Sequence, residues 1–197
     1  MTICLLLITF LIYSKYFLYY NIAMFTDPVK NLKQFALRDD MIVADLGAGS
    51  GFYTIPVAKI VSRGKVYAIE IQRDFLTTIR NKTKEAHIDN IECLVGNVEK
   101  IGGTGIKDKI VDAVIASNIL FQIEDRDKFI EEIKRILKPE GKLLLIDWSD
   151  SSMGIGSSFG KIIPKNNARE MFESNGFVLE RDISVGEHHY GMILIKS

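Results

Sequence analysis

Two hydrophobic patterns alternate along the chain after residue 27. Short uninterrupted apolar runs are typical of strands that are covered on both faces. Apolar residues three and four positions apart are typical of helices with one buried face, as at 126–138, where Pro139 and Gly141 then end the helix. The predicted strands are 41–46, 65–70, 90–95, 111–117, 142–148, 177–185 and 189–196, and the predicted helices are 52–61, 74–86, 126–138 and 165–175.

This order of elements predicts an α/β fold: an open, mostly parallel sheet with helices on both faces. The last two predicted strands are separated only by Gly186, Glu187 and His188. A parallel connection needs a dozen or more residues, so the last strand is predicted to run antiparallel.

The N-terminal segment, residues 1–25, differs from the rest, residues 26–197, which form one predicted domain. Residues 3–25 are almost wholly apolar or aromatic, and about 20 such residues can span a bilayer. Lys15 opposes insertion, at about 3 kcal/mol for a central lysine. The segment is either a membrane anchor or an extension upstream of a start at Met24. A cleaved signal peptide is disfavoured, because no basic stretch precedes the apolar run.

Composition disfavours some classes of partner. Lys plus Arg and Asp plus Glu are equal at 25 each, so the chain has no basic footprint for nucleic acid. Cys4 and Cys93 lie far apart, which indicates neither a disulfide framework nor a zinc site. Such cysteine use fits the reducing cytoplasm. Positive charge follows the apolar segment at Lys30, Lys33 and Arg38, so an anchored domain would lie on the cytoplasmic face of a membrane.

The candidate binding site lies where two predicted strands end. Asp45 ends the first strand and is followed by Gly47, Gly49 and Gly51. Glycine has no Cβ, so its backbone can approach a ligand closely. Glu70 ends the second strand, where a carboxylate can accept hydrogen bonds from both hydroxyls of a ribose. Because ligands of open α/β sheets bind at the carboxyl ends of strands, a nucleotide-like cofactor is predicted there.

A nicotinamide cofactor is one alternative. The dinucleotide fingerprint has the spacing G-x-G-x-x-G, which would place its third glycine at Phe52. Here the third glycine comes one residue early, at Gly51, and no second domain is present to carry a substrate. The pattern therefore disfavours an NAD(P)-dependent oxidoreductase.

Five motifs in order resemble those of the class I S-adenosylmethionine-dependent methyltransferases. They are V-A-D-L-G-A-G-S-G at 43–51, V-Y-A-I-E at 66–70, G-N-V-E at 96–99, D-A-V-I-A-S-N at 112–118 and the run 137–148. The resemblance covers about 28–197 and is closest to the type 11 group, which includes quinone-biosynthesis C-methyltransferases. It implies a Rossmann-like seven-stranded sheet, S-adenosylmethionine as cofactor and a small-molecule or lipid-like acceptor.

The resemblance also implies a role for each motif residue. Gly47, Gly49 and Gly51 would let the backbone approach the methionine part of the cofactor, with Asp45 turned toward its ammonium group. Glu70 would bind the ribose hydroxyls, and Ile71 would either cover one adenine face or pack in the core. Asn97 and the N–H of Val98 would bind the adenine edge. Ser117 would lie beneath the sulfonium. Asn97 stands where aspartate is commoner, so its contact depends on the orientation of the amide.

The acceptor decides whether a general base is needed, because only some acceptors must lose a proton. Candidates at the same sheet edge are Asp147, His189 and Tyr190, although the last two could also form an ordinary polar hairpin tip. Metal binding by His188 and His189 is disfavoured, because neighbouring strand residues point to opposite faces. Segment 149–160 is a candidate lid. A binding or partner-activating subunit without catalysis is a third alternative, and the sequence carries no signal for an oligomeric state.

Overall fold

A seven-stranded sheet forms the centre of the protein. In the computed structural model, residues 27–149, 162–186 and 188–197 are described. The strand order is β3-β2-β1-β4-β5-β7-β6. The strands are β1 (Ile42–Leu46), β2 (Lys65–Glu70), β3 (Ile91–Val95), β4 (Val111–Ser117), β5 (Leu137–Trp148), β6 (Phe177–Ile183) and β7 (His189–Lys196).

The pairing confirms the predicted topology. Strands β1 to β5 pair in parallel, whereas β7 lies between β5 and β6 and runs antiparallel to both. The reversed strand is therefore last along the chain but not at the edge of the sheet, which β6 occupies. Because β7 runs backwards, its first residues lie at the same edge as the carboxyl ends of the other strands, as the short predicted connection requires.

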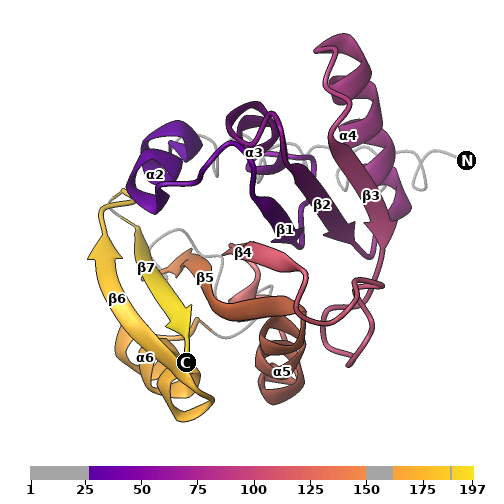
Figure 1. Ribbon diagram of the computed structural model, residues 1–197. Helices are drawn as coiled ribbons and strands as arrows, with labels where there is room; N and C mark the ends of the chain where they lie inside the picture. The colour runs from indigo at the N-terminus through magenta and orange to yellow at the C-terminus, as the bar shows by residue number, and fades with distance from the viewer. Residues whose placement is uncertain (1–26, 150–161, 187) are drawn as a thin grey trace, which may run out of the picture.

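Helices cover both faces of the sheet (Figure 1). On one face lie α2 (Pro28–Phe35), α3 (Thr54–Ile60) and α4 (Arg73–Glu85), and on the other lie α5 (Arg126–Ile136) and α6 (Lys165–Ser174). Alternate side chains of each central strand are buried under opposite helix layers. On β5, for example, Leu143 and Leu145 belong to the α5/α6 core, and Leu144 and Ile146 belong to the other. Burial on both faces explains the uninterrupted apolar runs.

Helix α2 was not among the predicted elements. The Asp27 carboxylate accepts hydrogen bonds from the N–H groups of Val29 and Lys30, and a proline begins the first turn, where no N–H is needed. Only two apolar side chains of this eight-residue helix, Leu32 and Phe35, are fully buried. So short a stretch shows too little periodicity to be recognised.

Helix α5 ends two residues before the predicted end at residue 138. Lys138 precedes a proline, which disfavours helical backbone there. Leu137 instead pairs with Val111 of β4, and the register shifts before Lys142 pairs with Ala113. Strand β5 thus begins directly after α5.

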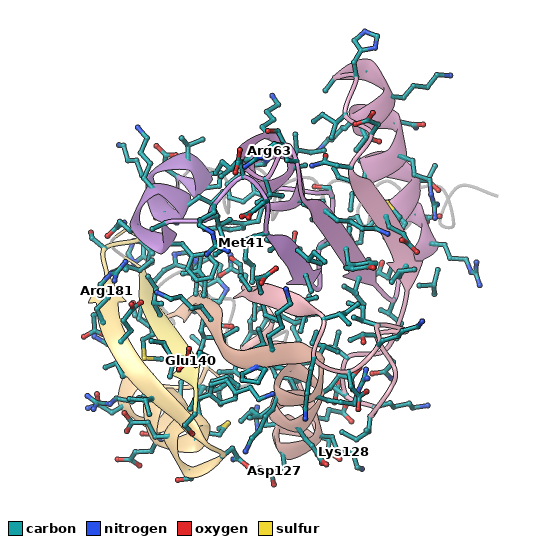
Figure 2. All side chains as sticks on the ribbon, viewed as in Figure 1. Met41, Arg63, Asp127, Lys128, Glu140 and Arg181 are labelled. Carbon is teal, nitrogen blue, oxygen red and sulfur yellow. The ribbon has the colours of Figure 1, made fainter. Side chains whose placement is uncertain are left out.

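Charged side chains lie mainly on the outside of the molecule, as Arg63, Asp127, Lys128 and Arg181 illustrate (Figure 2). None of the helices in the described part of the chain is long and apolar enough to cross a membrane. The apolar segment 3–25 lies outside the described residues, as does most of the candidate lid 149–160. Their predicted roles are not addressed by this fold.

Candidate active site

The glycine turn follows β1 and has the backbone that its sequence predicts. Gly47, Gly49 and Gly51 have φ values of 69°, 51° and 87°, in the left-handed region that favours glycine. A Cβ at Gly47 would also overlap Cδ1 of Ile119, which follows β4. A Cβ at Gly49 would meet no side chain within 4 Å. The turn therefore packs against the end of β4 at Gly47 and leaves open space at Gly49.

Asp45 is buried beneath this turn, with 3% of its surface exposed. The hydroxyl of Thr54, at the start of α3, donates a 2.6 Å hydrogen bond to its Oδ2. Burial raises the pKa of Asp45 to about 6; the Thr54 hydrogen bond works against this shift, and the charge of Glu70 adds to it. A buried carboxylate with a raised pKa is stabilised in its charged form by a cationic ligand.

Glu70 connects the end of β2 to the glycine turn. Its Oε2 accepts the N–H of Gly49 at 3.0 Å, and its Oε1 accepts the N–H of Gln72 at 3.0 Å. The side chain is 8% exposed, whereas Ile71, the next residue, is 60% exposed. Ile71 is thus not a core residue, and an exposed apolar side chain at this edge can cover an aromatic ring.

Asn97 lies in the turn after β3, and its amide orientation follows from its contacts. The Oδ1 atom accepts the N–H of Glu99 at 2.8 Å, so the Nδ2 group remains as a hydrogen-bond donor. The backbone N–H of Asn97 donates to the carbonyl of Gly103 at 3.0 Å. Val98 is buried next to it, with 8% exposed.

Glu99 makes hydrogen bonds between distant segments that the sequence did not predict. Its Oε2 accepts the N–H groups of Glu124 at 3.0 Å and Asp125 at 2.9 Å. This carboxylate joins the turn after β3 to the segment that leads into α5. The residues Asn97, Glu99, Lys100, Ile101, Glu124, Asp125 and Lys128 line a pocket between the two segments. A carboxylate that joins segments 25 positions apart has no local sequence pattern.

The end of β4 is the middle of the site. Ser117 ends the strand, and Asn118 follows with a φ of 53°, an uncommon conformation that asparagine tolerates better than most residues. The N–H of Asn118 donates to the carbonyl of Ile146 at 2.8 Å. Ile119 then packs onto Gly47. Ser117 and the glycine turn are therefore neighbours, as expected if both contact one cofactor.

Asp147, at the end of β5, supports the turn after β4. Its Oδ2 accepts the N–H of Leu120 at 2.7 Å and its Oδ1 accepts the N–H of Trp148 at 2.8 Å. Burial raises its pKa to about 6 against the effect of these backbone bonds. The bonds give Asp147 a structural task, holding the short helix η1 (Leu120–Gln122), and its catalytic role stays a prediction.

His189 and Tyr190 lie inside the protein and not on a polar hairpin tip. They are 6% and 5% exposed, respectively. The His189 ring stacks on Trp148 with centroids 4.1 Å apart, and Tyr190 is paired with Asp147 across β5 and β7. Both lie at the start of β7, at the carboxyl edge of the sheet. Strands β4 and β5 separate β7 from β1, which the glycine turn follows.

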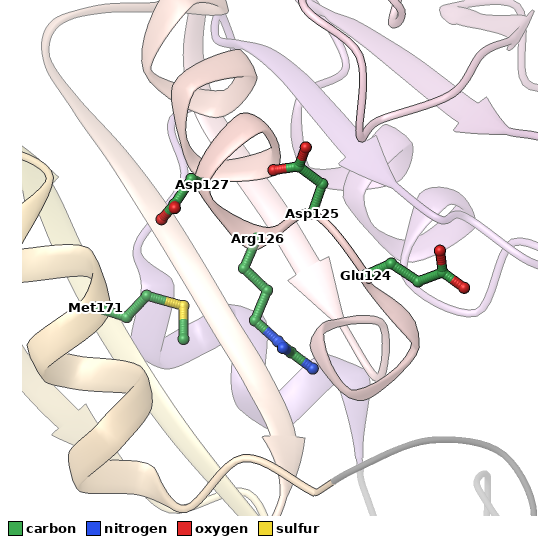
Figure 3. A pocket seen from close by; sticks show the side chains of 5 residues that line it. All are labelled: Glu124, Asp125, Arg126, Asp127 and Met171. Carbon is green, nitrogen blue, oxygen red and sulfur yellow. The ribbon is translucent and has the colours of Figure 1, made fainter.

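A pocket between α5 and α6 lies near this end of the sheet. It is lined by Glu124, Asp125, Arg126, Asp127 and Met171 (Figure 3). The Arg126 side chain extends away from Asp125 and Asp127. It makes no ion pair or hydrogen bond with another described residue, and its Nε atom is buried. This pocket shares no residue with the glycine turn, so it is a separate region from the predicted cofactor site.

A family model described as a methyltransferase domain matches residues 37–176. The chain belongs to this family. It is 32% identical over 115 residues to a ubiquinone/menaquinone biosynthesis C-methyltransferase of Hydrogenovibrio crunogenus, covering 57% of this chain and 44% of the relative, and 31% identical over 114 residues to its counterpart in Vibrio vulnificus. The chain thus spans less than half the length of these curated relatives.

Solved structures agree with this assignment. A SAM-dependent methyltransferase from Aquifex aeolicus is 29% identical, with a TM-score of 0.77, over 89% of this chain and 92% of that one. A geranyl diphosphate C-methyltransferase from Streptomyces coelicolor, 15% identical with a TM-score of 0.68 over 81% and 74% of the two chains, shares the fold. The predicted family resemblance and Rossmann-like fold are confirmed.

Proposed function

We propose that this protein transfers a methyl group from S-adenosylmethionine to a small-molecule acceptor. The observation that carries the proposal is the contact between Glu70 and the N–H of Gly49, which holds a carboxylate against an open glycine turn at the carboxyl edge of the sheet. The buried carboxylate of Asp45 lies beneath the same turn. Family membership supports this cofactor over a nicotinamide.

The residues present fit this cofactor. When bound, it would supply a methyl group on a positively charged sulfur, which moves to the acceptor atom and leaves a neutral thioether. Asp45 would face its ammonium group, and Glu70 would accept hydrogen bonds from its ribose hydroxyls. Ile71, exposed beside Glu70, would cover an adenine face, and the open space at Gly49 would admit the methionine part.

Asn97 would bind adenine as a donor. Because its Oδ1 is engaged by the N–H of Glu99, only the Nδ2 group is available. A ring nitrogen of adenine accepts a hydrogen bond, whereas the exocyclic amine is a donor and would face another donor. The N–H of Val98 would add a second donor at the same edge. We therefore assign Asn97 to a ring nitrogen of adenine.

The acceptor is proposed to be quinone-like or lipid-like. The names of the curated relatives, which refer to ubiquinone and menaquinone biosynthesis, support this choice. An apolar segment at 3–25, followed by basic residues, would place the domain at the cytoplasmic face of a membrane where such acceptors dissolve.

Calorimetry with S-adenosylhomocysteine, the demethylated cofactor, tests the assignment. Wild-type protein should bind it, and Glu70→Ala should weaken binding by about 100-fold, since hydrogen bonds to a charged group are each worth about 1.5–3 kcal/mol. Glu85→Ala, an exposed glutamate at the end of α4, is the matched control and should bind normally. Binding of NADH in place of S-adenosylhomocysteine would overturn the proposal. Cofactor binding without methyl transfer to any acceptor would identify a partner subunit instead.

A further inference from the structure

Buried polar atoms without a hydrogen-bond partner gather at one edge of this sheet. Such atoms are uncommon in folded proteins, and each calls for an explanation. Among the described residues they include Ser50 Oγ, Asn118 Oδ1, Arg126 Nε, Trp148 Nε1 and Tyr190 Oη. All of these residues follow the carboxyl end of a strand or begin the reversed strand β7, where the ligands of open α/β sheets bind.

Tyr190 carries a buried hydroxyl group at this edge. It is 95% buried, and it belongs to the core layer between the sheet and helices α5 and α6, with Met192 and Leu194. It is paired with Asp147, whose carboxylate is engaged by the N–H groups of Leu120 and Trp148. Its own hydroxyl makes no hydrogen bond.

The register places Tyr190 near the methyl-donor region. Ser117 pairs with Ile146 on β5, and the next residue of β5, Asp147, pairs with Tyr190 on β7. Two strand spacings separate β4 from β7, which is about 10 Å. Asp147, the strand partner of Tyr190, also accepts the N–H of Leu120 in the turn after β4, so Tyr190 lies beside that turn.

The chemistry of the hydroxyl is that of a donor and not of a base. Burial raises the pKa of Tyr190 far above neutral pH, and the charge of Asp147 raises it further. The unpartnered atoms of Trp148 and Arg126 at this edge of the sheet are N–H donors as well. These side chains therefore offer hydrogen-bond donors, and a ligand that binds beside them must supply hydrogen-bond acceptors.

We propose that the Tyr190 hydroxyl donates a hydrogen bond to an oxygen of the methyl acceptor and so orients it beside the end of β4. The acceptor class is a phenol or hydroquinone, whose oxygens offer lone pairs, and not an ammonium compound, which offers none. This inference rests on the proposed methyltransferase function. In the step itself, a ring carbon forms a bond to the methyl group, the sulfur–methyl bond breaks with its electron pair going to sulfur, and the proton on that carbon passes to solvent.

Tyr190→Phe is the decisive variant, because it removes only the hydroxyl. Tyr53→Phe is its matched control: the Tyr53 hydroxyl is also buried but accepts a 2.8 Å hydrogen bond from Nδ2 of Asn31. Tyr190→Phe should melt at the wild-type temperature or above, whereas Tyr53→Phe should melt below it, because only the second change leaves a buried group unpaired.

The transfer assay uses methyl-labelled S-adenosylmethionine with two probes, 1,4-dihydroxynaphthalene and dimethylamine, which carries no oxygen, with products read by mass spectrometry. The wild-type protein should methylate the hydroquinone and not the amine. Tyr190→Phe should lower kcat/KM for the hydroquinone by about 10-fold, as expected for the loss of one hydrogen bond that orients the acceptor, with unchanged affinity for S-adenosylhomocysteine.

Four results would overturn the inference. Wild-type kcat/KM in Tyr190→Phe would show that the hydroxyl does not touch the acceptor. A melting temperature lowered as in Tyr53→Phe would show a structural role. Methylation of dimethylamine alone would exclude the acceptor class. Failure of the wild-type protein to bind S-adenosylhomocysteine would refute the proposed function itself, and that measurement is separate from the transfer assay.

Discussion

Glu132 holds the loop after β3 from inside the protein, and replacing it tests how the turn that carries Asn97 is held. Its side chain in α5 is completely buried. Its two carboxylate oxygens accept hydrogen bonds from the N–H of Gly102, the N–H and hydroxyl of Thr104, and Nε and Nη2 of Arg135, at 2.6–3.1 Å. The loop after β3 is thus fastened to α5 by one carboxylate.

That loop positions the turn that carries Asn97. The carbonyl of Gly103 accepts the N–H of Asn97 at 3.0 Å, and Gly103 lies between the two residues that Glu132 binds. A change at Glu132 therefore acts on stability directly and on cofactor affinity through Asn97. No group of Glu132 needs to contact the cofactor for this second effect.

Glu132→Gln keeps the shape but removes the charge and turns one acceptor into a donor. That donor faces at least two N–H or O–H groups, whichever way the amide is placed. Breaking one side of a buried ion pair costs about 3–5 kcal/mol. The free energy of unfolding should fall by that amount, and the affinity for S-adenosylhomocysteine should fall with it.

The pH dependence of the free energy of unfolding gives an independent measure of the contribution of Glu132. Burial acts to raise the pKa of Glu132, but hydrogen bonds from Arg135, Thr104 and Gly102 outweigh it and lower the pKa from 4.5 to about 2. Because the folded pKa is below the unfolded one, the charged form stabilises the fold above pH 4.5, and this contribution is lost as the pH falls toward 2. The contribution is about 3 kcal/mol at neutral pH and about 1 kcal/mol at pH 3.

Urea unfolding at pH 7 and pH 3 measures both values for wild type and Glu132→Gln. The control is Glu131→Gln, an exposed neighbour on the same helix, which should stay within about 0.5 kcal/mol of wild type. A difference between wild type and Glu132→Gln below 1 kcal/mol at pH 7 would refute the assigned network. So would a difference that does not shrink at pH 3.

Two further predictions follow from the carboxylates of the site. The pKa of Asp45 is raised to about 6, and an ammonium ligand favours its charged form, so the affinity for S-adenosylhomocysteine should fall as the pH drops below 6. Binding at pH 6 should release about half a proton, which calorimetry in two buffers measures. An affinity that does not depend on pH from 5 to 8 would contradict this. Glu99→Ala should reduce that affinity severalfold by freeing the segment before α5, whereas Glu99→Gln should retain it, because a single oxygen of Glu99 accepts both N–H groups and an amide still offers one. Equal loss in both variants would show that charge, and not this bridge, is required.

The parts of the site that sequence predicts are those fixed by local chain direction. Asp45, Glu70 and Ser117 lie in or at the end of strands whose apolar runs are unmistakable, and parallel strands bring their carboxyl ends to one edge. The glycine turn is equally local, because its φ values depend on residue type. These features need no knowledge of distant contacts.

The remaining features depend on contacts between distant segments. Glu99 reaches Glu124 and Asp125, and the orientation of the Asn97 amide follows only from the bond to Glu99. Likewise, His189 and Tyr190 read as a polar hairpin tip because the sequence does not show that β7 is inserted between β5 and β6. Because β7 lies between two strands, both residues are buried, and the hydroxyl of Tyr190 is left without a hydrogen-bond partner.

The resulting edge has opposite hydrogen-bonding character at its two ends. Strands β1 and β2 present the carboxylates Asp45 and Glu70, which attract cations and hydroxyl donors, whereas β5 and β7 present the donors Trp148 and Tyr190. Under the two proposals above, the cofactor binds at the first end and an oxygen-bearing acceptor binds at the second. Changes at Glu70 should therefore act on cofactor affinity and changes at Tyr190 on the acceptor.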